Sequence, residues 1–294
     1  WLGNCSALTC PYHQWTYDLK GRLTGVPFRR GVKGQGGMPD DFRLEDHALH
    51  SLKVEVVNGA IFASFDDTVP AFADYLGPDM LYLFSRVFNG RKLRILGYQR
   101  QIIGSNWKLM MENIKDPYHA SLLHVFLLSF GLFRVDQKSA CFMDETKGHA
   151  ALTTRRAEVG DDSGTSDMAS YDPDYKLEDP RLIEPRKEFA DDITLAMTTI
   201  YPSLIVQQQS NTLAMRHLIP RGPEQFELAW TFFGYDDDDD EMRTLRLRQA
   251  NLMGAAGLVS IDDTEMMEFS QAGIRSALPG DAAVMELGGR DADA

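Results

Sequence analysis

Two histidines, His119 and His124, stand five positions apart, and the carboxylate of Asp116 lies three positions before the first of them. Imidazole is a common ligand for iron and zinc, so this segment is the first candidate for metal chemistry. At about 100° per residue, five positions place the two rings about 140° apart on a regular α-helix, too far round to share one ion. The rings meet only if a π-type bulge, or a break near Asp116-Pro117, loosens the helix. Otherwise they are two ordinary histidines on an amphipathic helix.

A second candidate site lies near the start of the chain, where Cys10 and His13 are separated by two residues. This spacing suits a metal held by a tight loop, but structural zinc and the Rieske cluster both need four protein ligands. Cys5 precedes Cys10 by five positions and lacks the short spacing of a zinc knuckle. The pair therefore indicates half of a metal site, and structural zinc is the less favoured interpretation.

Arg216 is the candidate for binding an anion. It lies in the strand-like segment 211–220 and alternates with apolar neighbours, a pattern that turns one face of a strand into a protein interior. A guanidinium group in such a place pairs well with a carboxylate, which it binds through two parallel hydrogen bonds. An arginine on a strand is, however, more often exposed or paired with an acid of the same protein.

Three carboxylates near the end of the chain, Asp262, Asp263 and Glu265, open a predicted helix. Acidic residues in this position usually cap the helix and interact favourably with its dipole. A site with two histidines and one carboxylate needs a third ligand, and this cluster offers it. The residues alone leave open which carboxylate, if any, is the ligand.

The order of predicted elements indicates an α+β protein. Val57-Asn58-Gly59-Ala60 joins two β-rich runs and predicts a hairpin. Residues 157–175 are acidic and poorly periodic, which predicts a mobile surface loop. The remaining predicted elements are a helix at 71–88, strands at 92–103, 194–209, 212–220 and 225–235, and a final helix at about 262–278 that carries apolar Met266, Met267, Phe269 and Ile274.

Composition favours a cytoplasmic enzyme subunit. The 294 residues are 44% hydrophobic, enough to bury a large core, and 30 basic against 43 acidic residues give a net charge of −13. This charge disfavours nucleic acid and anionic membranes as partners. The longest apolar run, residues 122–133, is too short to span a bilayer, and three cysteines give no disulfide framework. Six consecutive acids, residues 236–241, lack the spacing of a calcium loop and predict a solvated turn.

Two motifs in this order resemble those of a known family. Cys10-Pro-Tyr-His13-Gln-Trp, followed by a glycine-containing hairpin, is similar to the second ligand pair of a Rieske [2Fe-2S] domain. The segment from Asn106 to His124, N-W-K-x3-E-N-x2-D-x-Y-H-x4-H, resembles the mononuclear iron motif of the Rieske aromatic-ring-hydroxylating oxygenases, large (alpha) subunit. Within that family, the resemblance is to oxygenases of aromatic carboxylates, with salicylate hydroxylases first and terephthalate dioxygenases next.

The resemblance implies two domains. Residues 1–69 would be the C-terminal part of an all-β Rieske domain. Residues 70–294 would be a helix-grip (Bet v1-like, START-like) catalytic domain, with an antiparallel sheet around helices. The family's first C-x-H pair does not precede Cys10, so the chain is expected to be a fragment of a larger subunit, truncated at both ends and inactive alone.

The resemblance also assigns the site residues. His119, His124 and Asp263 would bind the mononuclear Fe(II), with Asp262 the alternative to Asp263. Asp116 would be catalytic, accepting hydrogen bonds from the histidines and offering a path for electrons. Arg216 would bind the substrate carboxylate, and Cys10 and His13 would be half of the [2Fe-2S] site.

The implied activity is hydroxylation of an aromatic acid, best matched by salicylate, with O2 and electrons from NADH. The resemblance implies that electrons pass through a reductase and a ferredoxin. Gly34-Gln-Gly-Gly37 lacks the spacing of a dinucleotide-binding fingerprint, so NADH is expected to bind the reductase. A small beta subunit and an alpha3beta3 or alpha3 oligomer are the expected assembly. One alternative is a ring dihydroxylating dioxygenase of the terephthalate or anthranilate type. Another, from a different class, is a non-catalytic helix-grip protein that binds a hydrophobic ligand.

Overall fold

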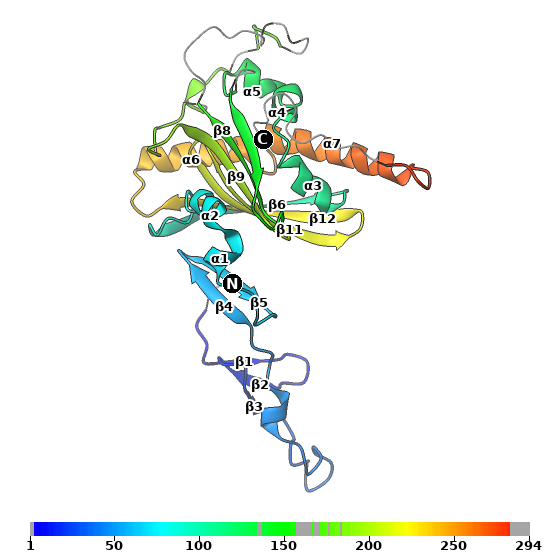
Figure 1. Ribbon diagram of the computed structural model, residues 1–294. Helices are drawn as coiled ribbons and strands as arrows, with labels where there is room; N and C mark the ends of the chain where they lie inside the picture. The colour runs from blue at the N-terminus through cyan, green and yellow to red at the C-terminus, as the bar shows by residue number, and fades with distance from the viewer. Residues whose placement is uncertain are drawn as a thin grey trace. The chain divides into compact units, whose positions relative to one another are not determined.

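The computed structural model (Figure 1) describes residues 3–133, 137–156, 166, 168, 171–175, 177–182 and 184–282. Contacts divide the chain into two compact units, Trp1–Val56 with Ile61–Pro70, and Val57–Ala60 with Ala71–Ala294. The predicted domain boundary between residues 69 and 70 stays a prediction. Most of the predicted loop at 157–175 lies outside the described residues. In the described part of the chain, no helix is long and apolar enough to cross a membrane.

The N-terminal part of the chain is built from short strands. A three-stranded antiparallel sheet has the order β1-β2-β3, and a separate hairpin pairs β4 with β5. Asn58 and Gly59 link β4 to β5, and both have positive φ (49° and 98°), the backbone that a two-residue hairpin turn requires. The predicted hairpin is therefore present. The elements are β1 (Ala7–Thr9), β2 (Thr16–Asp18), β3 (Leu23–Gly25), a 3-10 helix (Leu44–His47), β4 (Lys53–Val57) and β5 (Ala60–Ser64).

The larger unit contains a seven-stranded sheet with the order β6-β12-β11-β10-β9-β8-β7, in which all neighbours are antiparallel. From β7 to β12 each strand pairs with the next one along the chain, and β6 pairs with β12. The strands are β6 (Leu93–Ile103), β7 (Ser139–Met143), β8 (Ala150–Arg155), β9 (Ile193–Ile200), β10 (Leu204–Gln209), β11 (Thr212–Gly222) and β12 (Gln225–Tyr235).

Helices pack against this sheet and form the core with it. Figure 1 shows α3, α4, α5 and α7 lying together beside the sheet. Met110 and Met111 of α3 and Met267 of α7 join a buried cluster with Ile205 of β10 and Trp230 of β12. The helices are α1 (Phe72–Leu76), α2 (Pro78–Phe84), α3 (Trp107–Asn113), α4 (His119–Leu122), α5 (Val125–Ser129), α6 (Asp240–Met253) and α7 (Leu258–Arg275), with a 3-10 turn at Pro180–Leu182.

Two predicted elements are each divided in the structure. The predicted strand at 194–209 is the hairpin of β9 and β10, because Pro202 lacks the amide donor that a continuous central strand needs. The predicted helix at 71–88 is the pair α1 and α2, because Gly77 has a positive φ of 76° and Pro78 begins a new helix. The predicted strand at 225–235 is confirmed as β12.

Candidate metal centre

A break in the helical segment brings His119 and His124 together. His119 is the first residue of α4, and His124 is the residue directly before α5. The backbone of His124 has ψ of 65°, which is outside the helical region and redirects the chain between the two helices. The bend that the five-residue spacing requires is therefore a break between two short helices, and not a π-type bulge.

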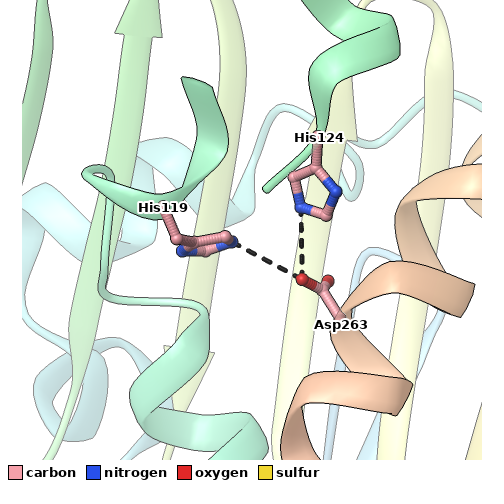
Figure 2. A group of neighbouring side chains, drawn as sticks. All are labelled: His119, His124 and Asp263. Atoms are coloured by element: carbon pink, nitrogen blue, oxygen red, sulfur yellow. Dashed lines mark ion pairs between the residues drawn. The ribbon is translucent and has the colours of Figure 1, made fainter. Parts of the chain in front are cut away.

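The two imidazole rings converge on one carboxylate, as Figure 2 shows. The Oδ1 atom of Asp263 lies 3.2 Å from Nε2 of His124 and 3.5 Å from Nε2 of His119. The ligand atoms of the three side chains all lie within 4.8 Å of one another. In the described part of the chain, this is the one group of three or more histidine, cysteine or acidic side chains close enough to hold a metal ion.

Each ring also faces a second carboxylate through its other nitrogen. The Oδ2 atom of Asp116 lies 3.4 Å from Nδ1 of His119, and Oδ2 of Asp262 lies 3.2 Å from Nδ1 of His124. Nδ1 of His124 forms a hydrogen bond with Asp262, whereas Nδ1 of His119 has no hydrogen-bond partner among the described residues and is affected by Asp116 through charge alone. A carboxylate beside Nδ1 favours a proton there and leaves Nε2 free to bind a metal. Asp262, the alternative to Asp263, thus faces the nitrogen that points away from the other ring.

Burial and close opposite charges set the electrostatics of this centre. Burial disfavours the charged ring of His119, but Asp116 and Asp263 outweigh this effect and raise its pKa to about 9. Burial also opposes ionisation of Asp263, yet the two histidines hold its pKa well below the usual range. Oδ1 of Asp263 is buried and has no hydrogen-bond partner among the described residues. The two imidazole Nε2 atoms and the unpaired Oδ1 of Asp263 form a donor set that fits a single iron ion.

Metal uptake by the apo chain should therefore release a proton from His119. Because its pKa is about 9, the ring is protonated at pH 7.5, and Nε2 must lose its proton before it binds a metal. We expect Co(II) affinity to rise by up to about tenfold per pH unit below pH 9 and to level off above it. Calorimetric titration in buffers of different ionisation enthalpy measures the released proton, and a pH-independent affinity would contradict this assignment.

Arg216 projects from β11 into a cavity that His119, His124 and Asp263 also line. The guanidinium carbon lies 4.5 Å from the centre of the Trp230 ring, and one terminal nitrogen lies 3.1 Å from the sulfur of Met197. Arg216 is buried, its Nε has no hydrogen-bond partner, and no carboxylate of the described residues forms an ion pair with it. Burial lowers its pKa to about 10, although the charge of Asp263 acts in the opposite direction, so the group remains charged at neutral pH.

Cys10 and His13 lie on a tight loop of the N-terminal unit. The amide of Gln14 donates to the carbonyl of Cys10, and the amide of Cys10 donates to the carbonyl of Trp15, both at 2.9 Å. The side chains of Cys10 and His13 are exposed, and among the described residues no third metal-ligating side chain joins them. The residues present supply two ligands and do not fit a four-ligand cluster.

Sequence reasoning missed two kinds of residue. The acidic run at 236–241 is not simply solvated, because the side chain of Asp238 is only 4% exposed and pairs at 2.8 Å with Arg246, which also pairs with Glu188. The cavity wall beyond Arg216 was not named, although Gln207 and Gln209 alternate along β10 on the face that lines the cavity. The signal that could have found them is the run of three glutamines, Gln207 to Gln209, at the end of a predicted strand, because its first and third members must share one face.

Comparison with protein families gives two matches along the chain. The family described as "Ring hydroxylating alpha subunit (catalytic domain)" matches residues 85–290. The "Rieske [2Fe-2S] domain" matches residues 2–35. The first match contains α3, the two histidines, Arg216 and Asp263, and the second contains Cys10 and His13.

The chain is also similar in sequence to individual oxygenase subunits. The chain is 50% identical to the large oxygenase component of salicylate 5-hydroxylase from Ralstonia sp, over 98% of this chain and 70% of that protein. It is 45% identical to the anthranilate 1,2-dioxygenase large subunit from Burkholderia cepacia, over 92% of this chain and 64% of that protein. It is 42% identical to a terephthalate 1,2-dioxygenase terminal oxygenase component (subunit alpha 2) from Comamonas sp, over 98% of this chain and 70% of that protein.

Among solved structures, naphthalene 1,2-dioxygenase from Rhodococcus sp. bound to indole matches with a TM-score of 0.71 and 22% identity. The match covers 92% of this chain and 64% of that one. At this identity the likeness concerns the fold, and it agrees with an α+β protein built on a large antiparallel sheet.

Proposed function

Because the chain belongs to the family of ring-hydroxylating oxygenase alpha subunits, we propose that it hydroxylates an aromatic carboxylate, with salicylate the favoured substrate. The two matched families imply a mononuclear iron and a Rieske cluster. The three named relatives act on salicylate, anthranilate or terephthalate, which are all aromatic carboxylates. The chain spans 64–70% of the length of these relatives, so the activity described here is that of the whole subunit.

The observation that carries this proposal is the place of Arg216. A buried guanidinium without a direct ion pair destabilises a fold. The nearby charge of Asp263 does not outweigh the effect of burial on Arg216, so a ligand that supplies a further negative charge would stabilise it. Arg216 lines the same cavity as His119, His124 and Asp263. An aromatic acid held by its carboxylate on Arg216 would therefore present its ring to the metal centre.

Each residue of the centre has a defined task in this proposal. Bound iron would supply the activation of O2. His119, His124 and Asp263 would hold this iron, because their ligand atoms all lie within 4.8 Å of one another. Asp262 would keep a proton on Nδ1 of His124 through a hydrogen bond, and Asp116 would favour a proton on Nδ1 of His119 through its charge alone. Both histidines would then offer Nε2. Apolar side chains that line the same cavity exclude water from the ring: Leu127, Leu132, Phe133, Leu152 and Met253.

The proposed partners follow from the same premise. The relatives are named as large subunits or oxygenase components, which supports a small subunit and separate electron-transfer proteins for this chain as well. We propose a ferredoxin and an NADH-dependent reductase as the electron donors, and an alpha3beta3 or alpha3 assembly. A non-catalytic carrier of the same shape is not favoured, because a hydrophobic ligand requires neither the three convergent metal-ligating side chains nor a buried cation.

The direct test is product analysis. The full-length subunit, co-expressed with a small subunit, ferredoxin and reductase, is offered salicylate, anthranilate, terephthalate, benzoate and naphthalene. We expect hydroxylated products from aromatic acids and none from naphthalene, which carries no carboxylate. Oxidation of naphthalene in preference to every acid would contradict the proposal.

Arg216→Ala should raise the KM for an aromatic acid by at least about tenfold, because the variant loses a charge-assisted pair with the carboxylate. Iron content should remain that of the wild type, since Arg216 is not a ligand. Steady-state kinetics with salicylate and iron analysis measure the two effects. Arg221→Ala is a matched control, because Arg221 lies at the far end of the same strand and pairs with Glu227. An unchanged KM in Arg216→Ala would count against the assignment.

A further inference from the structure

A second polar group of the cavity wall lacks a hydrogen-bond partner. Gln207 of β10 is 2% exposed and lines the cavity. Its Nε2 donates to Oε1 of Gln209 at 2.6 Å, which orients the amide. The Oε1 atom of Gln207 is buried and accepts no hydrogen bond from any described residue. Buried acceptors are normally paired, so an unpaired one that lines a ligand cavity points to a donor on the ligand.

Strand pairing places Gln207 beside Arg216. In the register of β10 and β11, Ile205 is opposite Arg216 and Gln207 is opposite Ala214. Residues directly opposite each other share a sheet face, as do residues two apart on one strand, so Gln207 and Arg216 lie on the same face. They are diagonal neighbours, within reach of one ligand that has two adjacent polar groups.

The unpaired atoms of the cavity wall differ in kind. Nε of Arg216 and Nε1 of Trp230 are donors without partners, and Oε1 of Gln207 is an acceptor. All three residues line the same cavity. A matching ligand would carry an anion that accepts hydrogen bonds and, next to it, a group that donates one.

We propose that Gln207 is a specificity-determining residue, which accepts a hydrogen bond from a hydroxyl or amino group ortho to the carboxylate bound by Arg216. This inference rests on the proposed function and narrows it to 2-hydroxy- and 2-aminobenzoates. Terephthalate is disfavoured, because its second substituent is a para carboxylate that cannot donate at neutral pH. A site that pairs a buried polar group with one substituent discriminates strongly against analogues that lack it.

The ligand series tests this inference without any substitution. Salicylate, benzoate and 2-methoxybenzoate are titrated calorimetrically into the Co(II)-loaded wild-type chain at pH 7.5, where all three carboxylates are ionised. Benzoate lacks the ortho substituent, and the methyl ether keeps the oxygen without its proton. We expect salicylate to bind about tenfold more tightly than either analogue.

Gln207→Met then tests the residue itself. The thioether fills a similar volume but is a weak acceptor, so the preference for salicylate over benzoate should fall to about twofold or less. Gln225→Met is the control, because Gln225 lies on β12 of the same sheet, is exposed and does not line the cavity. The preference should survive in this control. Circular dichroism and Co(II) stoichiometry verify that both variants fold.

The outcomes separate the inference from the proposed function. If salicylate and 2-methoxybenzoate bind equally well to the wild type, Gln207 does not accept a hydrogen bond from an ortho donor. If the salicylate preference persists in Gln207→Met, it has another origin, such as direct contact with the metal, and the inference is wrong. In both cases binding of an aromatic acid still supports the proposed function. If no aromatic acid binds, the proposed function fails and this inference fails with it.

Discussion

Replacement of His124 by alanine should abolish stoichiometric iron binding. His124 would supply one of the three ligands in the proposed iron site, and its Nε2 lies 3.2 Å from Oδ1 of Asp263. Loss of a residue that only supports a metal ligand typically lowers affinity by about 10- to 100-fold, so loss of the ligand itself should exceed the upper value. Anaerobic reconstitution with Fe(II), followed by desalting and metal analysis, gives the number of iron ions per chain.

His217→Ala is the control for this experiment. His217 lies on β11 and is exposed, so the same substitution there should leave one iron per chain. Retention of iron by His124→Ala would show that the metal is bound elsewhere. A variant that loses iron and also melts far below the wild-type apo protein would indicate a folding defect, so Asp263→Asn provides a second test. It keeps the volume of the side chain, and we expect it to lose iron as well.

Asp116→Asn should leave iron in place but lower turnover by at least about 100-fold. The side chain of Asp116 is 26% exposed and faces Nδ1 of His119, on the opposite side of the ring from buried Asp263. Asp116 thus connects the buried centre to the protein surface, and we propose that electrons enter along this contact. An asparagine keeps the shape but removes the charge that holds the Nδ1 proton of His119. The measurement is turnover of the full-length subunit with its electron-transfer proteins, together with iron content.

Glu112→Gln makes the same chemical change one helical turn earlier in the chain, where Glu112 pairs with Lys115 at 2.9 Å. Turnover in this control should stay close to that of the wild type. Wild-type turnover in Asp116→Asn would remove Asp116 from the electron path. Loss of iron in the same variant would instead assign Asp116 to metal binding.

Local signals explain the elements that were predicted correctly. Asn58-Gly59 adopts positive φ at both positions, so the sequence of the turn alone determines the hairpin of β4 and β5. The break between α4 and α5 has no such signal. Neither Leu123 nor His124 is a proline or glycine, yet the backbone of His124 lies outside the helical region. The spacing of the histidines therefore showed that a bend was needed, but not its kind.

The choice between Asp262 and Asp263 depends on the rotation of α7 about its axis. Neighbouring residues on a helix point about 100° apart, so packing decides which carboxylate faces the cavity. Asp263 shares a helix face with Met267, which enters the core, and with buried Ser260 and Gln271. This buried face is mostly polar, whereas Met266, Phe269 and Ile274 are exposed to different degrees. Hydrophobic periodicity consequently indicates the wrong face of this helix, and the sequence alone left the ligand open.

Diffraction from crystals of the iron-loaded protein, measured on both sides of the iron absorption edge, tests the central claim most directly. The account predicts one anomalous peak per chain in the larger unit, within bonding distance of Nε2 of His119, Nε2 of His124 and the carboxylate of Asp263. Absence of a peak at this position would contradict it. A peak bound by Asp262 or by the Nδ1 atoms would contradict it as well.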